Sequence, residues 1–263
     1  MRSSLQVTFV VAVNNTGILK CNLLASPCLQ GAHGHQLICQ ERFASAAQAY
    51  NDALDRAVND IVVFVHQDVF LPEGWLLRLE TAINTLAKDD PEWGVVGCWG
   101  VTERGEGFGY VHTPGQGVIG RAFERPHAVQ TLDEIVLTIR KSSGLRFDEQ
   151  VPHFHFYGAG ICMQAAMRGM KSYAISAFCI HNSEQYFTYP KEFYQCYRAV
   201  KRLYSSRLPI HTACITVTRY DTVLYWLRLR RRYWKLITPP RDRGHRAADP
   251  RLILDQLQAT QQV

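Results

Sequence analysis

The sequence has no apolar run approaching the roughly 18 residues that a membrane-spanning helix needs, so no transmembrane segment is predicted. The apolar stretch at residues 7–13 is short, lacks a small-residue cleavage site and runs into two asparagines, which is typical of a first strand rather than a signal peptide. The eight cysteines contain no C-x-x-C pair, the spacing that zinc ribbons and redox dithiols use. Buried, reduced thiols in a cytoplasmic protein are therefore expected.

Charge is distributed unevenly along the chain. The 263 residues carry a formal net charge of +6, yet residues 219–246 alone hold nine basic and two acidic residues. The remainder is nearly neutral, so the excess of positive charge belongs to one segment. A hydrophobic fraction of 47% and a charged fraction of 20% are ordinary for a globular protein and exclude a disordered or collagen-like chain.

Apolar periodicity predicts alternating strands and helices. Strands are expected at residues 7–13, 61–65, 94–99, 134–139 and 173–180, and helices at 45–58, 75–86 and 161–167. This order indicates an α/β fold with a mixed, mainly parallel sheet and helices on both faces. Residues 97–120 contain eight glycines but no G-x-x-x-x-G-K-[ST] phosphate loop, so a flexible loop or hairpin is predicted there.

Polar residues follow three of the predicted strands: Asn14-Asn15, His66-Gln67-Asp68 and His181-Asn182-Ser183. In open α/β sheets, ligands bind outside the carboxyl ends of the strands. Asp68 is placed to hold a divalent cation through oxygen, and His181 could complete that shell, because imidazole suits manganese better than calcium. Taken singly, Asp68 could cap a turn before Pro72, and His181 could be a hydrogen-bonded core histidine.

Three strings in this order, IVVFVHQDVFLPEGW, FDEQVPHFHFYGAGICMQAAMRG and AFCIHNS, resemble family 2-type glycosyltransferases of GT-A fold, in the glycosyltransferase-like branch related to the streptomycin-biosynthesis protein StrF. The resemblance covers about residues 5–215. It implies a GT-A-like domain over residues 1–215, a nucleotide-diphosphate sugar donor, Mn²⁺ or Mg²⁺, and inverting transfer to a saccharide, lipid-linked or small-molecule acceptor, as in polysaccharide biosynthesis.

The resemblance also implies roles for individual residues. It places Gln67 and Asp68 at the D-x-D position that holds the cation and the diphosphate, and His181 at a second metal-ligand position. Donor contacts are implied for the remaining matches, Val13, Asn14 and Asn51.

One departure from the family pattern concerns the general base. Related sequences carry an acid in the segment that here reads FYGAG, and both usual positions are glycine, Gly158 and Gly160. An acceptor hydroxyl needs a base within hydrogen-bond reach. The titratable residues nearby are Asp148, Glu149, His153 and His155. Glu149 is favoured for its reach, although Asp148 and Glu149 could equally be solvated turn acids. The alternative is a non-catalytic nucleotide-sugar-binding or scaffold protein at the membrane surface.

The basic segment is predicted to contain an amphipathic helix over residues 223–237, within a C-terminal extension at 216–263. Arg228, Arg231, Arg232 and Lys235 fall within an arc of about 100°. Tryptophans and tyrosines beside such a face suit an anionic membrane surface, which residues 219–246 could contact at the inner face of the cell membrane. A helix packed on the globule with a solvated basic face is the alternative. No recognition motif accompanies the charge, so nucleic acid is not an expected partner.

Overall fold

The computed structural model describes residues 5–31, 34–184, 188–239 and 245–260. Its central sheet contains β1 (Val7–Ala12), β2 (Gln36–Gln40), β3 (Ile61–Val65), β5 (Val95–Gly97), β9 (His127–Val129), β11 (Val136–Arg140) and β12 (Ser172–Ala174). The strand order is β2-β1-β3-β11-β5-β12-β9. β1 is parallel to β2 and β3, and β12 is parallel to β5, whereas β11 runs antiparallel to both its neighbours and β9 runs antiparallel to β12. The sheet is therefore mixed, with three parallel and three antiparallel pairings.

A second sheet contains the glycine-rich stretch. Its strands are β4 (Val69–Phe70), β6 (Trp99–Val101), β7 (Gly107–Thr113), β8 (Gly117–Gly120), β10 (Thr131–Leu132) and β13 (Cys179–His181). Their order is β10-β6-β7-β13-β4, with β8 on β7. The predicted hairpin is thus found as the antiparallel run β6-β7-β8. Gly109 has φ of 150°, and a Cβ there would lie 2.3 Å from the carbonyl oxygen of Cys98, so the close strand approach requires glycine.

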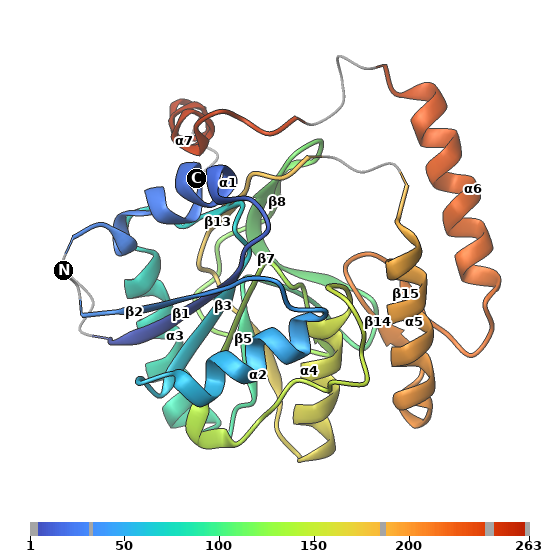
Figure 1. Cartoon of the computed structure of the whole chain (residues 1–263), viewed down its shortest axis with the longest axis horizontal. Coiled ribbons are helices and arrows are strands. Elements are labelled where there is room, and N and C mark those ends of the chain that lie inside the picture. Colours follow the sequence, from blue (N-terminus) through green and yellow to red (C-terminus); the bar gives the residue numbers. More distant parts are fainter. Residues whose placement is uncertain (1–4, 32–33, 185–187, 240–244, 261–263) are drawn as a thin grey trace.

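Helices cover both faces of the central sheet, as predicted (Figure 1). They are α1 (Thr16–Cys21) and α3 (Trp75–Asp89) on one face, and α2 (Ala46–Arg56), α4 (Tyr157–Met167) and α5 (Lys191–Leu203) on the other. Along β3, Val62 and Phe64 belong to the core beneath α2 and α4, whereas Val63 and Val65 belong to the core beneath α3. Because successive side chains of a strand point to opposite faces, a strand buried on both sides is apolar throughout.

Several element boundaries differ from the sequence prediction, among them the strand expected at 94–99, which divides into β5 and the start of β6. Helix α4 begins at Tyr157, four residues before the predicted start, so Gly158 and Gly160 lie in its first turn. Glycine has a low helix propensity, and the sequence pattern therefore placed the start after them. The predicted strand at 173–180 is two strands, β12 and β13, which belong to different sheets.

The C-terminal part contains a short hairpin, β14 (Ile210–His211) and β15 (Thr216–Val217), followed by α6 (Thr222–Ile237) and α7 (Pro250–Ala259). Figure 1 shows α6 beside α5, while α7 lies across the molecule near α1. Helix α6 matches the predicted helix at 223–237 to within one residue. Within the described ranges, none of the helices combines the length and apolar character needed to cross a membrane.

Candidate active site

The carboxyl ends of β1 and β3 meet at one edge of the central sheet, because the two strands are adjacent and parallel. Gln67, directly after β3, joins them: its Oε1 accepts hydrogen bonds from the backbone N–H groups of Asn14 and Asn15, both at 3.1 Å. Its Nε2 donates to Oδ1 of Asn14 at 2.5 Å. Gln67 and Asn14 therefore lie together as the sequence predicted, and Gln67 fixes the turn from which Asp68 projects.

Asp68 lies at the centre of a cluster with two histidines. Its Oδ1 lies 3.5 Å from Nε2 of His181, at the end of β13, and 4.0 Å from Nδ1 of His66, which follows β3. One ligand atom from each of the three residues lies within 4.8 Å of the others. The structure thus brings the predicted pair Asp68 and His181 together and adds His66, which lies in the same turn after β3 as Asp68.

The electrostatics of the cluster favour a charged Asp68. Burial raises the pKa of Asp68, but the hydrogen bond and charge of His181, with the charges of His66 and Arg246, outweigh it and hold that pKa well below its usual range. Burial also lowers the pKa of His181, yet Asp68 more than compensates, so the pKa of His181 is raised. Burial lowers the pKa of His66, and the charge of Asp68 opposes this only in part.

A second set of contacts orients His66. Its Nε2 lies 2.7 Å from the hydroxyl oxygen of Tyr157. That hydroxyl also donates to the carbonyl oxygen of Glu134 at 3.3 Å. The Tyr157 hydroxyl thus holds the Nε2 edge of the His66 ring, and Nδ1 faces Asp68. A metal-ligating histidine characteristically makes a hydrogen bond through its other ring nitrogen. Two imidazoles and one carboxylate form a donor set that suits Mn²⁺ and other divalent transition metals better than Ca²⁺.

A C-terminal residue also reaches the cluster. Nη2 of Arg246 lies 3.4 Å from Oδ2 of Asp68, and its Nε donates to the carbonyl oxygen of Asn182 at 2.9 Å. The buried Asn182 side chain bonds the backbone of Ala247 in both directions, accepting at 2.8 Å and donating at 2.9 Å. The segment at 246–247 is thus tied to the residue after His181, which places a guanidinium beside the predicted metal ligand.

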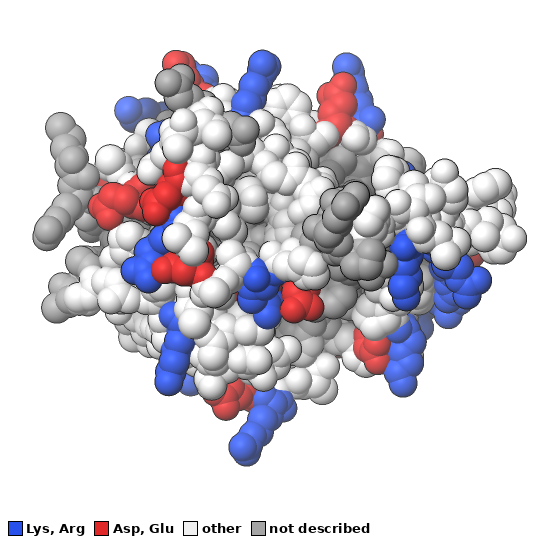
Figure 2. Space-filling view, turned by 90° about the horizontal axis from the view of Figure 1, so that it is seen from above, with Lys and Arg blue, Asp and Glu red and all other residues white. Residues whose placement is uncertain are grey.

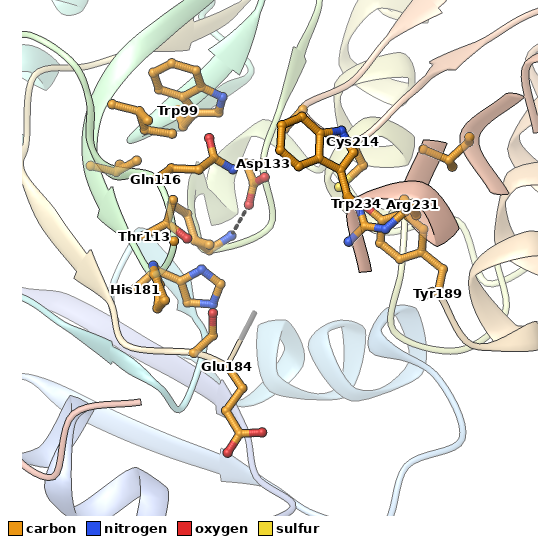
Figure 3. A pocket seen from close by; sticks show the side chains of 18 of the residues that line it. Trp99, Thr113, Gln116, Asp133, His181, Glu184, Tyr189, Cys214, Arg231 and Trp234 are labelled. Carbon is orange, nitrogen blue, oxygen red and sulfur yellow. Dashed lines mark hydrogen bonds between the residues drawn. The ribbon is translucent and has the colours of Figure 1, made fainter. Parts of the chain in front are cut away.

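Two pockets meet at this cluster. The strand-end pocket, about 820 Å³, is lined by residues that include Val13, Asn14, Gln67, Asp68, His155 and Arg246. The α6 pocket, about 670 Å³, is lined by residues that include Trp99, Asp133, His181, Tyr189, Arg231 and Trp234. Glu184 lines both pockets. Figure 3 shows Asp133 between His181 on one side and the Trp234–Arg231–Tyr189 group on the other. The cluster therefore stands between a pocket at the strand ends and a pocket walled by aromatic and cationic side chains.

Of the residues predicted as general base, His155 lies at a pocket, whereas Asp148 and Glu149 are hydrogen-bonded to other parts of the chain. His155 lines the strand-end pocket. Asp148 accepts hydrogen bonds from the Tyr204 hydroxyl at 3.0 Å and from its own turn at the Gln150 N–H. Glu149 accepts from Nδ2 of Asn51 at 3.0 Å.

Asn51 and His153 are likewise held by other parts of the chain. The buried Asn51 also exchanges two hydrogen bonds with the backbone of Phe147, both at 2.9 Å. Nε2 of His153 lies 2.7 Å from Oε1 of Gln195. Neither residue, nor Asp148 or Glu149, lines either pocket in the part of the chain that the structure describes. Their roles as base or donor contact stay predictions.

Helix α6 turns part of its basic side inward. The guanidinium carbon of Arg228 lies 4.2 Å from the ring centroid of Tyr194, and that of Arg231 lies 3.9 Å from the ring centroid of Tyr189. Trp234 and the basic residues Arg228, Arg230, Arg232 and Lys235 are nevertheless exposed. Six further exposed side chains are apolar or aromatic: Tyr225, Trp226, Leu229, Tyr233, Leu236 and Ile237. At about 100° per residue these six fall within an arc of about 120°. At the right edge of Figure 2, uncharged side chains project outward and Lys and Arg gather along one side. Residues 240–244 of the predicted membrane-binding segment lie outside the described residues.

The chain is similar to several known proteins. A curated relative, "ATP synthase subunits region ORF 6" of Fuscovulum blasticum, is 31% identical over 140 residues, which are 51% of this chain and 55% of that protein. The chain thus spans about half the length of this relative. Among solved structures, the mannosyltransferase PcManGT from Pyrobaculum calidifontis, in complex with GDP-Man and Mn²⁺, is 15% identical with a TM-score of 0.47, covering 97% of this chain and 75% of that one. S. aureus TarS 1–349 in complex with UDP-GlcNAc is 13% identical with a TM-score of 0.47, covering 90% and 77%.

The match to a protein family covers more of the chain than the match to the curated relative. The model of the family described as "Glycosyltransferase like family" matches residues 8–202, about three quarters of the chain. This range contains both strands that deliver the cluster, β3 and β13. The match confirms the family resemblance of the sequence, and the mixed α/β sheet with helices on both faces agrees with the GT-A-like fold class expected from it. The chain therefore belongs to the glycosyltransferase-like family.

Proposed function

We propose that the protein transfers a sugar from a nucleotide-diphosphate donor to an acceptor hydroxyl, with a divalent cation held by His66, Asp68 and His181. The observation that carries this proposal is the position of the three side chains, within 4.8 Å of one another where two pockets meet. A transferase needs such a meeting point, because donor and acceptor must approach one carbon atom from different directions.

The donor would occupy the strand-end pocket. Val13, Asn14 and Gln67 line it beside Asp68, which fits a nucleotide lying along the strand ends with its diphosphate directed at the cluster. A cation held there would neutralise the charge that develops on the diphosphate leaving group. Arg246, also in this pocket, would add a second positive charge close to the diphosphate. The donor set favours Mn²⁺ over Mg²⁺, since imidazole is the poorer ligand for magnesium.

The acceptor would enter through the α6 pocket. Trp99, Tyr189 and Trp234 line this pocket and offer flat apolar surfaces on which sugar rings pack, and Arg231 lies among them. Attack from this side, opposite the leaving diphosphate, would invert the configuration at the anomeric carbon. The acceptor would accordingly be a saccharide, free or carried on a lipid or a small molecule.

We further propose that α6 contacts a membrane surface, at the inner face of the cell membrane, through its outward apolar side. Leu236 is 84% exposed, Trp226 68% and Tyr225 64%, which would be unfavourable in water without a covering partner. Tryptophan and tyrosine are the residues that favour the headgroup level of a bilayer. Apolar burial, with attraction of Arg230 and Arg232 to anionic lipids, would supply the binding energy.

Vesicle sedimentation tests this surface. Leu236→Ser should reduce binding to vesicles that contain anionic lipid, whereas Leu252→Ser, at a 56% exposed leucine on α7, should not. Equal binding of the two variants would contradict the assignment of α6.

The second candidate function is nucleotide-sugar binding without transfer, which the glycines at 158 and 160 favour. One experiment separates the two candidates. The purified chain is incubated with Mn²⁺ and a panel of nucleotide sugars, and release of nucleoside diphosphate is measured with water or added glycans as acceptor. Release by the wild-type protein that is lost in Asp68→Ala supports transfer. Binding of a donor by calorimetry without any release supports the binding protein.

A further inference from the structure

The family resemblance implies an acid in the first turn of α4, where this chain has glycine, and at Gly158 another residue lies against the backbone. A Cβ on Gly158 would lie 2.6 Å from the carbonyl oxygen of Leu132 and 3.2 Å from Cγ of Glu134, with Cδ of Glu134 at 3.5 Å. Position 158 therefore has no room for a side chain, and the carboxyl-bearing end of Glu134 lies beside it. Gly160, by contrast, has only Val151 near it, at 3.7 Å.

We propose that Glu134 is the general base of the transfer, supplying from the loop before β11 the carboxylate that the first turn of α4 lacks. This inference rests on the proposed function and names a residue that the sequence analysis did not consider. No motif identifies Glu134, because its position at the start of α4 results from chain segments 24 residues apart.

Glu134 lies close to residues of the proposed metal site and of both pockets, although it lines neither pocket itself. Its backbone carbonyl oxygen accepts the Tyr157 hydroxyl, which in turn contacts His66. Glu134 lines a cavity of about 50 Å³ together with His155 and Cys214. His155 also lines the strand-end pocket, and Cys214 also lines the α6 pocket. The small cavity thus shares residues with each of the two pockets, and under this proposal acceptor and donor would meet there.

The surroundings of Glu134 suit a base that works near neutral pH. Burial raises its pKa to about 8, the charge of Asp133 adds to this, and hydrogen bonds from the backbone of Glu134, Gly158 and Phe156 oppose it. The other titratable groups around it include His155, Tyr157, Tyr189 and Cys214, with Tyr50 and Cys162 also close enough to feel its charge. A general base is most effective when its pKa is close to the operating pH.

The proposed step balances as follows. The acceptor oxygen forms a bond to the anomeric carbon of the donor as the bond from that carbon to the diphosphate oxygen breaks. The electron pair of the broken bond leaves with the nucleoside diphosphate. The hydroxyl proton of the acceptor moves to the carboxylate of Glu134, which releases it to solvent after the product leaves. When water is the acceptor, the same step hydrolyses the donor.

The test measures nucleotide release with Mn²⁺ in variants of Glu134 and of a control glutamate. Glu134→Gln should lower kcat by about 100-fold or more and leave the KM for the donor within about 3-fold, because it removes the proton acceptor and keeps the shape of the side chain. Glu92→Gln, at an exposed glutamate, is the matched control and should behave as wild type. Added formate should restore part of the activity of Glu134→Ala by supplying a carboxylate, a rescue that a merely structural residue would not show.

The outcomes separate the two proposals. Glu134→Gln with turnover within a few-fold of an active wild type would overturn the assignment of Glu134 and leave the proposed function standing. Loss of turnover in Glu149→Gln together with full activity in Glu134→Gln would transfer the role to Glu149. If Glu134→Gln is unfolded by circular dichroism, an absence of formate rescue in a folded, Mn²⁺-binding Glu134→Ala protein would overturn the assignment. Absence of release by the wild type with every donor would overturn the proposed function itself.

Discussion

Replacement of Asp68 by asparagine should abolish most of the affinity of the protein for Mn²⁺. Asp68 is the one anionic member of the cluster, and its side chain is only 15% exposed, so water has little access to replace it. Asparagine keeps the size of the side chain but removes the charge, and the amide must then face His181 and Arg246 at 3.5 and 3.4 Å. Changes to groups that merely support metal ligands typically cost 10–100-fold in affinity.

Loss of a charged ligand should lower the affinity for Mn²⁺ by at least about 100-fold, the upper end of that range. We therefore expect the Kd of Asp68→Asn for Mn²⁺ to rise by about 100-fold or more, which corresponds to about 2.7 kcal/mol. Isothermal titration calorimetry with Mn²⁺ measures this change directly. His181→Ala should have a smaller effect, because water can replace a second ligand. Asp89→Asn, at an exposed partner of Arg125, is the matched control.

The reasoning would be refuted by an Asp68→Asn protein that is folded by circular dichroism and binds Mn²⁺ within a few-fold of wild type. Such a result would mean that the cation, if bound, sits elsewhere, and that the cluster is a structural hydrogen-bond network. Loss of Mn²⁺ binding in Asp89→Asn to the same degree would also contradict it, because general charge and not direct ligation would then govern the affinity.

Three further predictions concern single residues. The affinity for Mn²⁺ should rise with pH through and above 6.5, because His181, whose pKa is raised above that ordinary value, must lose its proton before it binds a cation; calorimetry at several pH values would show a flat profile if His181 is not a ligand. Arg246→Ala should increase the affinity for Mn²⁺ several-fold, since the guanidinium competes for Asp68; an unchanged Kd would contradict this. Asn51→Ala should lower the free energy of unfolding by about 1–3 kcal/mol in urea, because it leaves the buried backbone groups of Phe147 unpaired; an unchanged midpoint would show that water replaces the amide.

The sequence by itself determined the α/β class, the family and the strand ends that carry the proposed site. Apolar strands and amphipathic helices follow from local periodicity, and strand β3 runs directly into its polar residues without a long loop. Adjacent parallel strands end at the same edge, so Asn14, Gln67 and Asp68 were predictable neighbours. The chain order of the motifs was enough to predict that His181 lies beside Asp68.

Only the tertiary structure decided which further residues lie beside Asp68 and His181. The role of His66 depends on the hydroxyl of Tyr157, 91 residues away, which fixes the orientation of its ring. The proposed role of Glu134 depends on the contact between the loop before β11 and the first turn of α4, which neither segment encodes alone.

The orientation of α6 is also a tertiary property. Its periodicity separates a basic side from an apolar side but carries no information on which side packs against the protein. Tyr189 and Tyr194 stack with Arg231 and Arg228, and these cation–π contacts turn two of the basic residues toward the protein and leave the apolar side outward. Arg230, Arg232 and Lys235 stay exposed. A sequence pattern reports the environment that each residue prefers on average, whereas contacts between distant segments decide which of two amphipathic surfaces the fold covers.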